Sequence, residues 1–212
     1  MKNKTYFYLS IIVVIFSFVI SIYLYPFLPE QMVSHWNYSG IPDGYSSRFW
    51  GAFLLPIIMV IFLIFAKVFS HFDPLNSNIK KFEKSFDWFL FGLNIFFFLL
   101  HIFLLLWNLG FYFSINKLMA ILFALLFYIM SILIKNAKQN YFIGIRTPWT
   151  LHSEIVWNKT HALASKLIPI LSIFCLIGLI FPNYLSILLF IPLILIFGYI
   201  IFYSYFEFKK IK

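Results

Sequence analysis

Three ionisable side chains in one stretch of the chain, residues 140–166, are the strongest candidates for chemistry. Arg146, Glu154 and His161 lie in the sequence NYFIGIRTPWTLHSEIVWNKTHALASK, between two apolar runs. A carboxylate and an imidazole on one helix face can transfer protons or hold a cation. An arginine can bind a carboxylate or a phosphate through two parallel hydrogen bonds. The HExxH pattern of zinc peptidases is absent from the sequence.

The helix that would position these side chains is predicted to begin at Thr147, because Thr is a good N-cap and Pro148 suits the first helical position. Such a helix places Glu154, Trp157 or Asn158, and His161 on one face. That face could do acid–base or ion-binding work. It could instead be a scaffold in which Arg146 holds Glu154 or a lipid phosphate, and the surplus of aromatic side chains favours this second interpretation. The candidate binding or signalling residues are Arg146, Thr147, Pro148, Trp149, Glu154, Trp157 and His161.

A second polar segment, YPFLPEQMVSHWNYSGIPDGY at residues 25–45, follows the first apolar run. Its prolines stiffen the chain, and Pro42-Asp43-Gly44 is a turn signature. Glu30, His35 and Asp43 could form an acid–base or metal group, but their spacing fits no ligand motif that we know. A structured lid is therefore the favoured interpretation. Its motif residues are Tyr25, Pro26, Pro29, His35, Trp36, Asn37, Gly40, Pro42, Asp43 and Gly44.

The rest of the chain has the composition of a membrane protein. Of its 212 residues 63% are hydrophobic and only 11% are charged, whereas soluble domains carry roughly 25% charged residues. Six apolar runs are long enough to cross a bilayer. We expect an all-α, multi-pass protein of the prokaryotic plasma membrane, whose first run is a retained helix because no small-residue cleavage site follows it. The predicted spans are 5–25, 49–69, 86–107, 115–134, 163–181 and 184–206.

The basic residues predict the orientation. With the N-terminus in the cytoplasm, all of the 16 Lys and Arg residues except Arg48 and Lys117 fall on inner segments. Both termini are then cytoplasmic, the loop 26–48 lies outside, and the segment 135–162 lies inside. The formal charge of +9 therefore reflects basic inner loops that face the lipid bilayer, and direct nucleic-acid binding is not expected.

Polar residues inside the predicted spans are few. Asn94 and His101 are seven residues apart, so they share one face of the third span. An intramembrane ionisable residue is a functional candidate, but hydrogen bonding between helices is favoured over a proton path. The single cysteine, Cys175, excludes an internal disulfide and a cysteine-based metal cluster. We expect no cofactor and no metal.

Together the two polar segments resemble a known family. The pattern YPxLPxxxxxHWNxxGxPDGY resembles a small membrane domain of unknown function found at the N-terminus of SdpI-type proteins. The segment NYFIGIRTPWTLHSEIVW, with the following HALA, is similar to the signature of the SdpI family itself. The resemblance covers both motifs, the six spans and the length. It divides the chain into a helical pair with its outer loop, residues 1–70, and a four-helix SdpI-like region, residues 71–212.

The resemblance implies a task that the residues alone do not. The best-known family member is an immunity protein against a secreted killing peptide, and it holds a small transcriptional repressor at the membrane when the peptide binds. We therefore expect a non-enzymatic membrane protein that neutralises or senses a membrane-active peptide, with a secreted toxin and a small cytoplasmic repressor as partners. The alternative is a membrane enzyme or transporter that acts on a lipid, peptide or ion through Arg146, Glu154 and His161.

Overall fold

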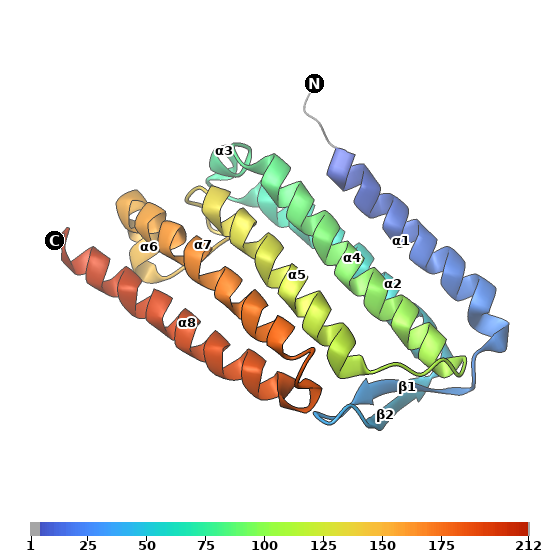
Figure 1. The fold of residues 1–212 in the computed structure, drawn as a ribbon. Helices are drawn as coiled ribbons and strands as arrows, with labels where there is room; N and C mark the ends of the chain where they lie inside the picture. Colours follow the sequence, from blue (N-terminus) through green and yellow to red (C-terminus); the bar gives the residue numbers. More distant parts are fainter. Residues whose placement is uncertain (1–4, 212) are drawn as a thin grey trace.

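The apolar runs form a bundle of long helices in the computed structural model, which describes residues 5–211 (Figure 1). Six helices within this range are long and apolar enough to cross a membrane. This confirms the predicted all-α, multi-pass architecture. The six are α1 (Thr5–Leu24), α2 (Arg48–Phe72), α4 (Glu83–Asn108), α5 (Ile115–Asn136), α7 (Glu154–Ile177) and α8 (Leu185–Lys209).

Shorter elements occupy the two ends of the bundle. A two-stranded antiparallel hairpin, preceded by a short helical turn, joins α1 to α2, and short helical elements also lie in the α2–α4, α5–α7 and α7–α8 connections. These elements are η1 (Tyr25–Phe27), β1 (Gln31–Trp36), β2 (Pro42–Ser47), α3 (Asn76–Ile79), α6 (Pro148–His152) and η2 (Pro182–Tyr184). Figure 1 shows the hairpin at one end of the bundle, and α3, α6, the start of α1 and the end of α8 at the other. We call these the hairpin end and the inner end.

The bundle has two halves. The first is made of α1, α2 and α4, and the second of α5, α7 and α8, with α4 packed against α5 between them. The core around Met32 lies in the first half and the core around Ile168 in the second. The core around Met59 joins them, because it also includes Leu133 of α5 and Trp157 of α7.

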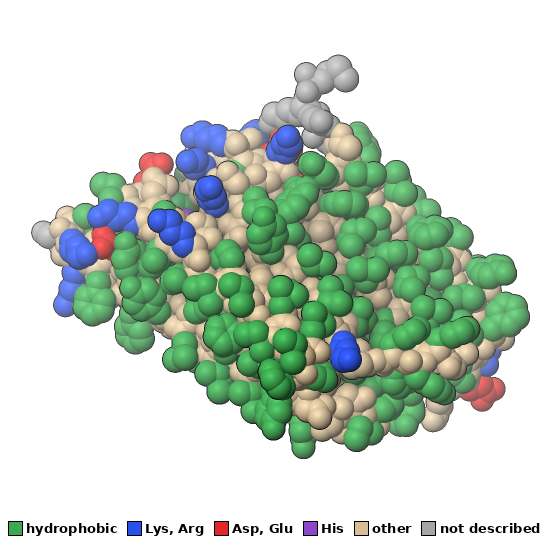
Figure 2. Space-filling view, viewed as in Figure 1, with side chains coloured by type: hydrophobic (Ala, Val, Ile, Leu, Met, Phe, Trp, Pro, Cys, Tyr) green, Lys and Arg blue, Asp and Glu red, His purple; other side chains and the backbone are tan. Residues whose placement is uncertain are grey.

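The surface matches a bilayer environment. Figure 2 shows apolar side chains over most of one face, with Lys and Arg gathered towards the inner end. Large apolar residues are exposed on α1 and α8, the helices at the two edges of the bundle, such as Ile12 and Ile194. In water such a surface would aggregate, so lipid must cover it. Lys2, Lys4 and Lys212, which the orientation argument also uses, lie outside the described residues.

Three sequence expectations differ from the structure. The predicted span 163–181 begins earlier, at Glu154, because Ser153 caps a new helix there. The loop 26–48 contains two strands that were not predicted. The turn expected at Pro42-Asp43-Gly44 lies instead at Asn37–Gly40, where the Asn37 side chain accepts the Ser39 and Ile41 amides and Gly40 has φ +77°. Pro42 to Gly44 belong to β2.

Topology is directly testable. A reporter that is active only in the cytoplasm should give signal when fused after Lys212 and none when inserted at Gly40, because the basic residues are concentrated on one side. Gly40 lies outside the helices, in the hairpin turn whose Tyr38 and Ser39 are exposed, so insertion there should leave the helices intact. Cytoplasmic activity of the Gly40 fusion would invert the orientation.

Candidate functional site

The hairpin is held on the first half by a buried methionine and an asparagine. Met32 is fully buried and packs on Gly51, where a Cβ atom would lie 2.6 Å from the Met32 Sδ. Asn108, at the end of α4, imitates a neighbouring strand. Its Oδ1 accepts the Val33 amide at 2.7 Å and its Nδ2 donates to the Val33 carbonyl at 3.0 Å. The edge of β1 is therefore paired at Val33.

A second asparagine ties the hairpin to the other half. Asn116, in the first turn of α5, donates from Nδ2 to the Tyr38 carbonyl at 3.0 Å and to the Pro182 carbonyl at 3.1 Å. Gly40 packs against Ile115 and Asn116. The hairpin consequently spans the boundary between the halves at its own end of the bundle.

The ionisable residues of the hairpin form a pair and no metal site. His35 Nδ1 lies 2.5 Å from Asp43 Oδ1 across the strands, and both side chains are well exposed. Within residues 5–211, no group of three His, Cys, Asp or Glu side chains is placed to hold a metal ion. The pair therefore helps to fix the register of the hairpin next to its bulge.

A cavity of about 650 Å³ lies beneath the hairpin, and we call it the outer cavity. Its volume is typical of small-ligand pockets. The hairpin contributes Ser34, Trp36, Asn37 and Ser46, while α2, α4, α5 and α8 contribute mainly apolar side chains such as Leu54, Phe103, Met119, Phe123 and Leu189. Two polar atoms of these hairpin residues, Trp36 Nε1 and Ser46 Oγ, have no hydrogen-bond partner within the described chain. His35 also lines the cavity, which thus has a polar roof and a mainly apolar floor.

At the inner end, the predicted signature segment begins with a folded loop, residues 137–146, which we call the inner loop. Asn140 is fully buried and organises it. Its Nδ2 donates to the Lys138 and Ile143 carbonyls, and its Oδ1 accepts the Phe142 and Ile143 amides. These bonds satisfy backbone groups that would otherwise be unpaired near the hydrocarbon.

The inner loop comes from the second half but packs on the first. Buried Asp73 accepts the Tyr141 amide at 2.8 Å, and Asn78 donates to the Gln139 carbonyl at 2.8 Å. The Phe142 ring stacks on Phe69 with centroids 5.4 Å apart. The inner loop therefore bridges the two halves at the inner end, as the hairpin does at the other.

His161 supports the inner loop through both of its ring nitrogens. Nε2 lies 3.1 Å from the Ile145 amide nitrogen and Nδ1 lies 2.9 Å from the Trp157 carbonyl. Since an amide can only donate, Nε2 is the acceptor and Nδ1 carries the proton. The imidazole also stacks on the Trp157 ring at 4.0 Å, and Trp157 Nε1 donates to the Ala137 carbonyl. This geometry gives His161 and Trp157 a structural role.

Arg146 and Glu154 do not form the expected pair. Arg146 is exposed and donates from Nη1 to the Tyr141 carbonyl at 2.7 Å, and no described carboxylate makes an ion pair with it. Glu154 and His161 both lie on α7, seven residues apart and so on the same side of that helix, but Glu154 is exposed in its first turn whereas His161 is buried further along. Ser153, whose backbone is extended, divides the helix expected from Thr147 into α6 and α7.

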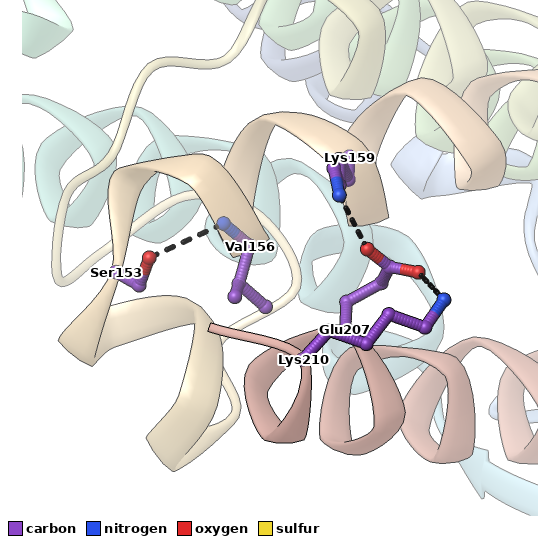
Figure 3. Close-up of polar contacts among 5 residues, drawn as sticks. All are labelled: Ser153, Val156, Lys159, Glu207 and Lys210. Atoms are coloured by element: carbon purple, nitrogen blue, oxygen red, sulfur yellow. Dashed lines mark hydrogen bonds and ion pairs between the residues drawn. The ribbon is translucent and has the colours of Figure 1, made fainter. Parts of the chain in front are cut away.

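The remainder of the signature segment anchors α6 and α7 on α8. Thr147 caps α6 and contacts Ser204, while the Trp149 ring lies 5.1 Å from that of Tyr205. The side chain of Ser153 accepts the Val156 amide, and Lys159 and Lys210 both bind the buried carboxylate of Glu207 (Figure 3). The Glu207 carboxylate raises the pKa of Lys210. The predicted helix start is confirmed, since Thr147 is the N-cap of α6 and Pro148 is its first residue.

The intramembrane polar residues face the interior, as predicted. Asn94 and His101 are both buried on α4. His101 Nε2 lies 2.9 Å from Ser21 Oγ, which donates to the Ala52 carbonyl at 2.7 Å. The described residues thus join α1, α2 and α4 by a hydrogen-bonded chain, which supports packing over proton transfer.

Several residues that hold both ends together escaped prediction from the sequence. They are polar residues near the ends of apolar runs: Asp73, Asn78, Asn108, Asn116, Gln139 and Asn140. Each acts on a segment far away in the chain or on backbone amides of an irregular loop. The only sequence signal for these contacts was a single polar residue, in most cases asparagine, close to the end of an apolar run.

Comparisons with known proteins agree with the two-segment pattern. Residues 12–60 match a domain of unknown function (DUF1648), and residues 136–204 match the SdpI/YfhL protein family. The chain is 29% identical over 188 residues to Immunity protein SdpI of Bacillus subtilis (strain 168), covering 89% of this chain and 88% of that protein.

A second similarity is shorter. The chain is 43% identical over 49 residues to the uncharacterized membrane protein YbgB of Bacillus subtilis (strain 168), covering 23% of this chain and 54% of YbgB. No solved structure matches the chain significantly. The chain is thus similar to the SdpI/YfhL protein family over residues 136–204, which contain the inner loop, and similar to Immunity protein SdpI along nearly its whole length.

Proposed function

We propose that this protein is a membrane immunity protein that protects its cell from a membrane-active peptide. The observation that carries the proposal is the similarity to Immunity protein SdpI along nearly the whole chain. Similarity to an immunity protein also favours a non-enzymatic role. The geometry around His161 supports this view, since both ring nitrogens are engaged and Glu154 lies apart on the surface.

We propose the outer cavity as the place where the peptide is bound. Its roof carries hydroxyl and amide groups, and its floor is apolar. A peptide segment in a membrane offers backbone groups that seek hydrogen bonds together with apolar side chains, and both would be accommodated. The volume suits a few side chains of the peptide rather than a whole helix.

Because both ends of the bundle have a segment that bridges the two halves, binding at one end could be sensed at the other. The hairpin and the inner loop both bridge the halves of the bundle. A peptide that binds one arrangement of the halves more tightly would shift their population, and the inner loop would change with it. The family's repressor role is a further part of this proposal. A gene for a small winged-helix repressor beside this one would support it, and a neighbourhood without toxin or repressor genes would argue against it.

Filling the outer cavity tests the binding site. Met119→Trp should reduce resistance of sensitive cells to the killing peptide of the SdpI system about tenfold, because the indole would occupy the space that the peptide needs. The readout is survival at graded peptide concentration. Leu125→Trp is the matched control, since Leu125 faces outward on the same helix. Full resistance of Met119→Trp at wild-type abundance would exclude the outer cavity as the site.

A further inference from the structure

A second cavity, of about 590 Å³, lies against the inner loop, and we call it the inner cavity. Like the outer cavity, it is lined by residues of α2, α4, α5 and α8, which come from both halves of the bundle. All the residues that line the inner cavity are apolar or glycine. They include Phe62, Phe65, Leu93, Phe142, Ile145 and Phe197. A cavity with this lining accepts hydrocarbon and offers no side chain to a polar ligand.

The inner cavity reaches the lipid-facing surface. Phe62 and Phe65, on its α2 side, are 43% and 52% exposed although they also line the cavity. In a bilayer the molecules that meet this surface are lipid acyl chains. An acyl chain can therefore enter from the side without crossing water.

A cation lies next to the lining of this cavity. Ile145 lines the cavity, and the next residue, Arg146, is exposed at the inner end. Its guanidinium donates one bond, to the Tyr141 carbonyl, and forms no ion pair within residues 5–211. A guanidinium has five donor groups and binds phosphate with two parallel bonds. Most of its donors are therefore available to an anion at the membrane surface.

The surroundings of Arg146 are also basic. Exposed lysines lie at the inner ends of α4 and α5 and on the connections there, namely Lys80, Lys81, Lys84, Lys135 and Lys138, and Figure 2 shows Lys and Arg gathered towards this end. Buried carboxylates here already have partners: Asp73 accepts amides, Asp87 binds Lys67, and Glu207 binds two lysines. Basic pockets between membrane helices recruit anionic head groups.

We propose that the inner cavity and Arg146 form a binding site for one anionic phospholipid, with an acyl chain in the cavity and the phosphate on the Arg146 guanidinium. A bound lipid would stabilise the inner loop in two ways: its acyl chain would contact Phe142 and Ile145 in the cavity, and its phosphate would bind Arg146 at the surface. The site is independent of the proposed immunity function, since it uses the opposite end of the boundary from the outer cavity.

The test is lipid retention by the full-length protein purified in a neutral detergent, measured by native mass spectrometry. Phosphatidylglycerol and phosphatidylcholine with identical acyl chains are added in separate titrations, and inorganic phosphate in a third. The wild-type protein should retain one phosphatidylglycerol in preference to phosphatidylcholine, and phosphate alone should not compete at equal concentration. Arg146→Gln should weaken phosphatidylglycerol binding about tenfold, and Arg146→Lys should weaken it less.

Two further variants separate the parts of the site. Leu93→Trp, which fills the inner cavity, should reduce retention of phosphatidylglycerol by a similar factor even if Arg146 variants cannot be purified. Lys166→Gln removes the same charge from an exposed position on α7 and should bind like the wild type. Equal retention of the two lipids by the wild type, or undiminished retention by Leu93→Trp or by folded Arg146→Gln, would overturn the proposal.

Discussion

Replacing Gly144 with alanine is expected to lower the free energy of unfolding by about 3 kcal/mol. Gly144 has φ +121°, a conformation that residues with a side chain rarely adopt. A Cβ atom there would also lie 2.5 Å from His161 Nε2 and 3.0 Å from the Trp157 ring. Backbone strain and collision therefore act together, and the inner loop should leave its place on the stacked rings.

The measurement is unfolding of the purified protein in mixed micelles, followed by tryptophan fluorescence. Gly198→Ala is the matched control, because a Cβ at Gly198 in α8 meets no atom within 4 Å and alanine favours helix. The control should unfold like the wild type or slightly later. If the two variants were equally stable, the close packing of the inner loop on His161 and Trp157 would be wrong.

Truncating Trp157 to alanine should be the most damaging single change in the signature segment, whereas Glu154→Gln should be nearly silent. The Trp157 side chain is fully buried, stacks on His161 and donates to the Ala137 carbonyl. Losing a buried tryptophan costs about 3–5 kcal/mol. Glu154 is exposed, and the amide that replaces its carboxylate keeps its size and polarity.

Peptide resistance and membrane abundance, measured side by side, decide between a scaffold and a catalytic pair. Trp157→Ala should lose both. Trp149→Ala should do less damage, because that ring is only partly buried against Tyr205. An inactive Glu154→Gln at wild-type abundance, beside a functional Trp157→Ala, would bring the enzyme or transporter alternative to the front.

The helices were predictable because the bilayer imposes a simple rule of length and apolarity. The predicted boundary at 115–134 differs from α5 by only two residues. The shared face of Asn94 and His101 followed from their spacing, since residues seven apart lie on one side of a helix, and the structure buries both. The length and apolarity of the runs therefore predicted most of the architecture.

The ends of the bundle were not predictable in the same way, because their structure depends on contacts between distant residues. The β1 edge is paired by Asn108, which lies 75 residues after Val33. The inner loop depends on Asp73, which lies 68 residues before Tyr141. No local pattern encodes such partners, and the turn signature at Pro42 was overridden by the side chain of Asn37.

The candidate site was predicted in composition but not in geometry. A single helix was expected to run on from Thr147, and Ser153 divides it into α6 and α7, although Glu154, Trp157 and His161 all lie in α7. His161 was singled out as one partner of a carboxylate, but in the structure its partners are the Ile145 amide and the Trp157 carbonyl. A capping serine inside an apparently continuous helix was the local signal for the break.

The membrane potential of peptide-sensitive cells tests the immunity role most directly. Cells that express this protein should keep their potential when the killing peptide of the SdpI system is added, while cells with the empty vector depolarise. The Met119→Trp protein at equal abundance should protect less than the Leu125→Trp protein. Depolarisation of expressing cells at the same rate as vector cells, with the protein present in the membrane, would contradict the account.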